Sequence, residues 1–156
     1  MADQAWNRWP SLLALFEELP LSSAMPELLP RSRRSDSTVV AASIKDLAEF
    51  PDLLAGLWLY VDDLQKSHEI SQTLTGPIGA YWHGIMHRRE GDFSNSKYWL
   101  RQARGIELPI SGYEPTRYVD QVEQAKGSNP LDLLKIQRDE WLGLFSYCAS
   151  RAGVKV

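Results

Sequence analysis

Apolar side chains recur at spacings of three and four residues along most of this chain, which is the period of amphipathic helices. Trp9, Leu12, Phe16 and Leu19 form the first such stripe, and a proline in its first turn is compatible with a helix. Residues 53–60 are apolar almost all round and predict a core helix. The pattern predicts helices over 6–19, from 44 with Ser43 as the cap, and over 51–60, 77–90, 94–104, 115–126 and 130–152.

No segment shows the alternating pattern of a half-buried strand, so the predicted class is all-α with no significant sheet. With 156 residues and 44% apolar content, the chain can bury one sizeable core, which predicts a single domain over residues 1–156. Its expected central apolar set is Leu53, Leu54, Leu57, Trp58, Ile85, Tyr98, Trp99, Trp141, Leu144 and Phe145. Residues 20–38 hold three prolines, several serines and a basic cluster, and predict an irregular connection, most simply a flexible surface loop.

A weak internal repeat organises the middle of the chain. A shift of 29 residues places Asp62-Asp63-Leu64 on Gly91-Asp92-Phe93, and Ser67 on Ser96. The second copy resembles a tetratricopeptide repeat, in which Gly84, Gly91-Asp92-Phe93, Ser96, Leu100 and Ala103 match the small, turn and packing positions. The resemblance implies antiparallel helical hairpins, so the expected architecture is a helical bundle built around such hairpins.

Charge and composition narrow the classes of partner. A net charge of -3 gives no general attraction to nucleic acid or to an anionic membrane, so neither is expected as a partner. No stretch approaches the ~18 apolar residues of a membrane span, and no leader pattern opens the chain. The single cysteine, Cys148, lies in an apolar setting that predicts a buried side chain. A soluble, cytoplasmic protein is the resulting expectation.

All three histidines fall within twenty residues of one another. His83, His87 and Glu90 are spaced four and three apart, so on a helix they form one narrow stripe. The repeat places both histidines at positions that normally face the partner helix, which predicts buried or half-buried imidazoles. Such rings need hydrogen-bond partners, and His68 and Glu69 from the preceding hairpin are the expected ones, together with nearby acidic residues. The network either locks the helices in register or forms a site.

The segment that follows is dense in groups able to bind anions. Arg88, Arg89 and Lys97 are cationic, and Ser94 or Asn95 is the expected cap of the next helix, whose amino end would favour a carboxylate or phosphate. These cations are accordingly predicted near the edge of the histidine site.

The segment from Ser67 to Gln72, followed by that from Tyr81 to Trp99, resembles a family of small helical proteins to which no function is assigned. The resemblance covers roughly residues 55–105 and departs at Ser96, where alanine is expected. It implies that the polar positions belong to a shared motif, and it carries no catalytic roles.

Two functional interpretations remain open. The first is a binding or interaction domain for a small anionic or polar ligand or a peptide terminus, with candidate residues His68, Glu69, His83, His87, Arg88, Arg89, Glu90 and Lys97. The second is a hydrolase-like enzyme that uses a divalent metal held by His68, His83, His87 and Glu90, or a metal-free His–Glu acid–base pair. The binding interpretation is preferred, because a pair of histidines four residues apart is common by chance whereas a complete set of metal ligands is not. The motif also lacks the glutamate placement of zinc hydrolases.

Overall fold

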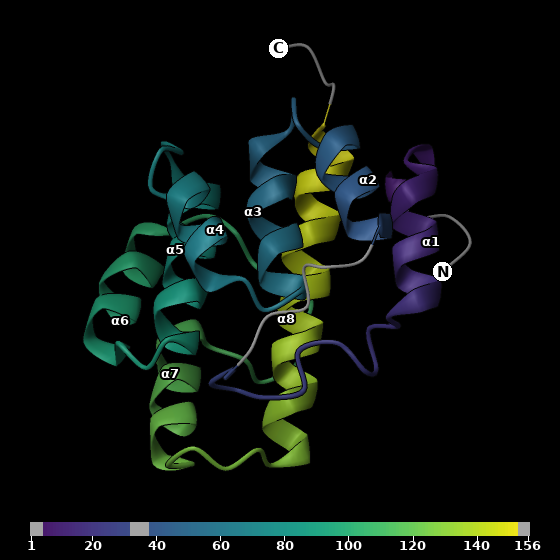
Figure 1. The fold of residues 1–156 in the computed structure, drawn as a ribbon. Coiled ribbons are helices and arrows are strands. Elements are labelled where there is room, and N and C mark those ends of the chain that lie inside the picture. The colour runs from purple at the N-terminus through teal and green to yellow at the C-terminus, as the bar shows by residue number, and fades with distance from the viewer. Residues whose placement is uncertain (1–4, 32–37, 153–156) are drawn as a thin grey trace.

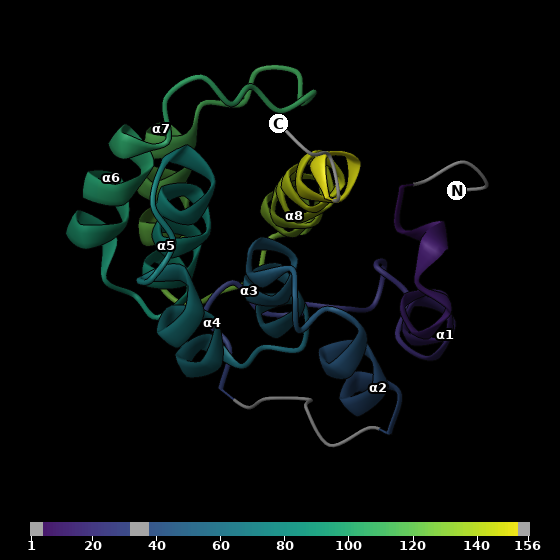
Figure 2. The ribbon, with the colours of Figure 1, turned by 90° about the horizontal axis from the view of Figure 1, so that it is seen from above.

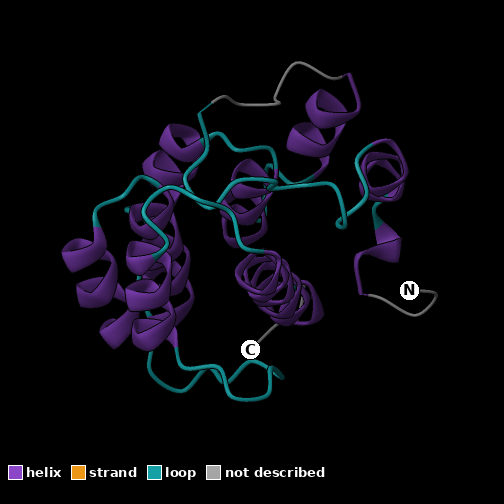
Figure 3. Cartoon of the chain, turned by 90° about the horizontal axis from the view of Figure 1, so that it is seen from below, coloured by secondary structure: helices purple, strands orange, loops and turns teal. Residues whose placement is uncertain are grey.

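The computed structural model describes residues 5–31 and 38–152 of the chain. Within these residues the chain forms helices and loops and no strand, which confirms the predicted all-α class (Figure 3). None of the helices in these two ranges has the length and apolar character of a membrane span. In chain order the helices are the 3-10 turn η1 (Ala5–Arg8), α1 (Pro10–Glu18), α2 (Thr38–Asp46), α3 (Pro51–Tyr60), α4 (Leu64–Ser71), α5 (Pro77–Arg89), α6 (Phe93–Gln102), α7 (Pro115–Gln124) and α8 (Leu131–Arg151).

The long helix α8 lies in the middle of the molecule (Figure 1). Helices α4 to α7 gather on one side of it and α1 and α2 on the other, while α3 packs directly beside it (Figure 2). Helices that follow one another in the chain contact each other from α3 through α7. The histidine-bearing helices α4 and α5 therefore lie next to each other in the larger group.

An aromatic cluster joins α8 to the helices around it. The rings of Trp141 and Phe145 stack with their centroids 4.5 Å apart, and Tyr60 from α3 lies 4.6 Å from Trp141. Phe16 from α1 meets the same group edge-on. The indole of Trp141 also donates a hydrogen bond of 2.8 Å to the carbonyl of Gly56, so its one polar atom is satisfied inside the core.

The hairpins α3–α4 and α5–α6 repeat the same inter-helix contact. The hydroxyl of Ser67 donates to the carbonyl of Ala55 at 2.9 Å, and Ser96 donates to Gly84 at 2.6 Å. These pairs are related by the 29-residue shift found in the sequence. A small residue on one helix faces a buried hydroxyl on the next, which lets the two backbones approach closely.

The turns of the two hairpins also correspond. Asp62 and Gly91 occupy equivalent places with positive φ angles of 62° and 86°. The next residue caps the following helix in each case, since Asp63 accepts from the backbone of α4 and Asp92 from that of α6. The observed cap of α6 is thus Asp92, two residues before Ser94 and three before Asn95, which were the expected caps.

Three further expectations differ from the structure. The predicted first helix is split into η1 and α1, and α2 begins at Thr38, so Ser43 lies inside a helix that it was expected to cap. Tyr98, assigned to the core, is 54% exposed because it projects from the outer face of α6. Among the residues that were expected in the core, Trp141, Leu144 and Phe145 are buried, and Cys148 is buried as predicted.

The described part of the proline-containing connection is packed rather than a loose surface loop. Ala24, Met25 and Leu28 are buried. Their segment is held to α8 by side chains that donate to its carbonyls: Arg138 reaches Ala24 at 2.9 Å, and Gln137 reaches Met25 at 3.2 Å. Residues 32–37 of this connection, including most of its basic cluster, lie outside the described residues.

The close approach at Gly84 gives a test of the α5–α6 contact. A methyl group added there would meet the Leu100 side chain at 2.6 Å, whereas one added at Gly143 in α8 would find its nearest neighbour at 3.4 Å. We expect Gly84→Ala to lower the free energy of unfolding by about 1–3 kcal/mol through overpacking. Gly143→Ala should be neutral or stabilise by up to about 1 kcal/mol, because alanine favours helix. Urea unfolding of both variants checks the contrast, and equal effects would contradict the packing argument.

Candidate functional site

Helices α4 and α5 bring the three imidazoles together. His68 comes from α4, and His83 and His87 lie one turn apart on α5 with exposures of only 5% and 6%. The Nε2 atoms of His68 and His83 are 3.1 Å apart, and the rings of His83 and His87 stack at 4.7 Å. The prediction that both α5 histidines are buried and face His68 is therefore confirmed. We call these three residues the histidine cluster.

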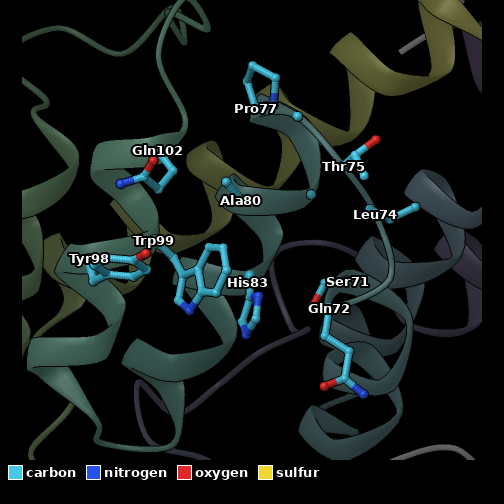
Figure 4. Close-up of a pocket in the computed structure, with 12 residues that line it drawn as sticks. Ser71, Gln72, Leu74, Thr75, Pro77, Ala80, His83, Tyr98, Trp99 and Gln102 are labelled. Atoms are coloured by element: carbon cyan, nitrogen blue, oxygen red, sulfur yellow. The ribbon is translucent and has the colours of Figure 1, made fainter.

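A further aromatic ring holds the cluster in place. The indole of Trp99 from α6 stacks on His83 with a centroid distance of 4.1 Å and an interplanar angle of 14°. Figure 4 shows the two rings side by side, with Ser71 and Gln72 on the opposite side of His83. This stacking fixes the plane of the His83 ring, so its nitrogen atoms are directed before any ligand binds.

His87 is oriented by hydrogen bonds at both ring nitrogens. Its Nδ1 lies 2.6 Å from a carboxylate oxygen of Glu90, and its Nε2 lies 3.2 Å from the side-chain amide of Asn95. The carboxylate accepts the Nδ1 hydrogen, and the lone pair on Nε2 accepts from the Asn95 amide, so a ligand that binds Nε2 has to displace that amide. Glu90 was predicted in the site. Asn95 was considered only as a helix cap, although its place in the motif with His87 was a usable signal.

The burial of His83 makes it a neutral base at ordinary pH. Desolvation, and then the proximity of His87 and His68, lower the pKa of His83 from its usual 6.5 to about 4. A neutral imidazole has one free nitrogen lone pair, which is the form that ligates metals.

The cluster can hold a metal ion. One potential ligand atom from each of His68, His83 and His87 lies within 4.8 Å of the others. Zinc–nitrogen bonds of about 2.0–2.1 Å in a tetrahedron place two ligand atoms roughly 3.3 Å apart, close to the spacing of His68 and His83. A second group of His87, Glu90 and Asp92 meets the same distance limit, but both of its carboxylates are on exposed residues. The histidine cluster is therefore the better-formed set.

The predicted cations do not line this cluster. Arg88 is fully buried and makes a bidentate ion pair with Glu140 of α8, at 3.0 and 2.9 Å. Arg89 is also buried and donates to Asp62 at 2.6 Å and to the carbonyl of Leu59 at 2.8 Å. Successive residues of a helix point about 100° apart, so the arginines face other elements than His87 does.

The two remaining candidates are also placed elsewhere. Lys97 forms an ion pair with Asp120 of α7. Glu69 is exposed, and its carboxylate accepts a hydrogen bond from Gln65 one turn earlier on α4. Of the eight candidate residues, the structure thus brings together His68, His83, His87 and Glu90.

The buried arginine pair belongs to a network in the core. The Glu140 carboxylate also accepts from the hydroxyl of Tyr113 at 2.5 Å, and that hydroxyl lies 2.7 Å from the hydroxyl of Tyr81. Burial alone would lower the pKa of Arg88, but the charge and hydrogen bonds of Glu140, together with Tyr118 and Tyr113, raise that pKa. Arg88 is therefore a permanently charged structural group.

A cavity of about 390 Å³ adjoins the cluster at His83. It lies between the end of α4, the start of α5 and the outer part of α6 (Figure 4). Comparison of the chain with protein-family models, with curated proteins and with solved structures gave no match, so the functional argument rests on this geometry.

The lowered pKa of His83 predicts an acid-sensitive fold. The folded protein binds this proton more weakly than the unfolded chain, so unfolding free energy should fall as pH drops from 6.5 to about 4. His83 should contribute at most about 3 kcal/mol of this loss. Urea unfolding of metal-free protein against pH should show a smaller loss for His83→Gln. An NMR titration that placed the His83 pKa near 6.5 would refute the prediction.

The ion pair between Arg88 and Glu140 predicts a large contribution to the free energy of unfolding. Glu140→Gln leaves Arg88 buried without its counter-charge and should cost about 3–5 kcal/mol of unfolding free energy. The matched control is Asp139→Asn on the same helix, which breaks only the exposed pair with Lys135 and should cost under about 1 kcal/mol. Thermal and urea unfolding compare the two variants. Equal losses of unfolding free energy in the two variants would contradict the prediction that the buried pair contributes more than the exposed one.

Proposed function

We propose that this protein binds a divalent metal ion of the zinc class through His68, His83 and His87, as part of a binding site for a small polar ligand. The observation that carries the proposal is the convergence of three imidazoles from two helices. Imidazole nitrogen suits zinc and its neighbours in the first transition row. Three neutral ligands also leave a coordination position for water or a ligand, as in catalytic zinc sites.

Two neighbouring features support a metal centre over a purely structural cluster. Glu90 accepts from Nδ1 of His87, which is the carboxylate–histidine contact that commonly orients a zinc ligand. His68 is only partly buried, so the cluster is open to an entering ion on the α4 side. A polar ligand is favoured over an anion because Arg88 and Arg89 are paired within the core.

A second candidate function is acid–base catalysis without a metal. The contact of 2.6 Å between His87 and Glu90 is the specific observation in its favour, since an oriented imidazole is a typical general base. The same three histidines with a bound metal would instead serve a hydrolase-like enzyme by activating water. Metal binding separates these alternatives.

The proposal predicts one zinc ion per chain. Untagged protein stripped with a chelator and titrated with zinc sulfate in a calorimeter should bind one equivalent at pH 7.5. Bound zinc should also raise the melting temperature, because it binds the native state. His68→Ala should weaken zinc binding by about tenfold or more, since a three-ligand site loses one ligand. Glu90→Gln should weaken it by about 10–100-fold through the loss of orientation.

The matched control is Glu69→Ala, which alters the residue next to His68 on α4 but removes no ligand. It should retain the zinc affinity of the unmodified protein. Zinc binding that survives in both His68→Ala and His87→Ala, or that never reaches one equivalent, would exclude the proposed site. A protein that binds no zinc but loses an activity in Glu90→Gln would favour the acid–base candidate.

A further inference from the structure

The cavity next to the histidine cluster is built from uncharged residues, some of them small and two of them, Tyr98 and Trp99, aromatic. Gly79 and Ala80 on the first turns of α5 form part of its wall, with His83 one turn further along. Gln72 and Thr75 line it from the α4–α5 connection, and Gln102 from α6 (Figure 4). Its volume of about 390 Å³ falls at the lower end of the ~300–1,000 Å³ typical of small-molecule sites.

No aspartate, glutamate, lysine or arginine occurs among the described residues that line this cavity. Its side-chain polar groups are amides, hydroxyls, one imidazole and one indole, each of which can pair with an uncharged donor or acceptor. A charged ligand group in this space would gain no counter-charge from the residues that line it.

We infer that this cavity is a binding site for a small uncharged molecule that carries an amide, lactam or hydroxyl group. Gln72 and Gln102, which line the cavity from opposite sides, carry side-chain amides that can pair with such a group, and the small residues Gly79 and Ala80 leave room beside them. This inference goes beyond metal binding and does not require it, because only His83 is common to the cavity and the cluster.

Three compounds of similar shape and different charge test the inference. Benzamide, benzoate and benzamidine share one ring and differ in being neutral, negative and positive. Each is titrated into isotope-labelled, metal-free protein at pH 7.5 and followed by amide and indole NMR signals. Benzamide should bind at least ten times more tightly than either ion, and should shift the Trp99 indole signal, assigned with Trp99→Phe.

Two tryptophan substitutions provide a matched pair. Gln102→Trp places a large ring at the cavity and should weaken benzamide binding at least tenfold. Gln124→Trp places the same ring on an exposed position of α7 outside the cavity, and should change the affinity by less than twofold.

Equal or tighter binding of benzoate or benzamidine would overturn the inference, as would absence of binding by all three compounds. Benzamide binding that is the same in Gln102→Trp and Gln124→Trp would place the ligand elsewhere and overturn it too. The outcome is separable from the proposed metal function. Selective benzamide binding in a protein that binds no zinc would support the cavity site and reject the metal site. Zinc binding without selective benzamide binding would support the metal site and reject the cavity site.

Discussion

The burial of helix α5 is the constraint on which the rest of the structure depends. Every residue from Gly79 to Arg89 is buried, although this stretch contains two histidines and two arginines. Groups of this kind are stable inside a protein only when they are paired or hydrogen-bonded. Each neighbour of α5 therefore has to present a polar partner at a defined position, and the placement of those partners determines how the helices pack.

The polar residues of α5 have two sets of partners, one for the arginines and one for the histidines. Arg88 reaches Glu140 on α8, and Arg89 reaches Asp62 in the α3–α4 turn and the carbonyl of Glu27 in the long connection. These two ion pairs and the hydrogen bond to Glu27 tie distant parts of the chain to one helix. The histidines instead face α4 and α6, next to a cavity. The arginines thus fix the frame in which the imidazoles are held.

Local pattern was sufficient to predict some of this arrangement. The period of apolar residues located the helices, and the 29-residue repeat placed His83 and His87 toward the preceding hairpin, where His68 lies. Local pattern could not pair Arg88 with Glu140, which lies 52 residues further along the chain. Adjacent arginines such as Arg88 and Arg89 therefore predict an anion site unless the acidic residues that pair with them from distant parts of the chain are known.

The role of the connection before α2 was hidden for a similar reason. Proline and serine predict irregular backbone, but they do not reveal what satisfies its carbonyl groups. In the structure Arg138 and Gln137 of α8 donate to those carbonyls, and Arg89 donates to Glu27. An irregular segment can therefore be buried when long side chains replace the hydrogen bonds of regular structure. Only the three-dimensional positions of these donors show which loops are fixed.

The internal repeat shows which residues occupy the positions of His83 and His87 in the first hairpin. The 29-residue shift matches His83 and His87 to Leu54 and Trp58 in α3, where apolar side chains fill the corresponding positions of the first hairpin. Packing of such a hairpin therefore does not require polar groups at these positions. Buried polar residues often stabilise a fold less than apolar residues of similar size. The exchange to histidine in the second hairpin, opposite a third histidine on α4, therefore supports the proposed binding role of the cluster.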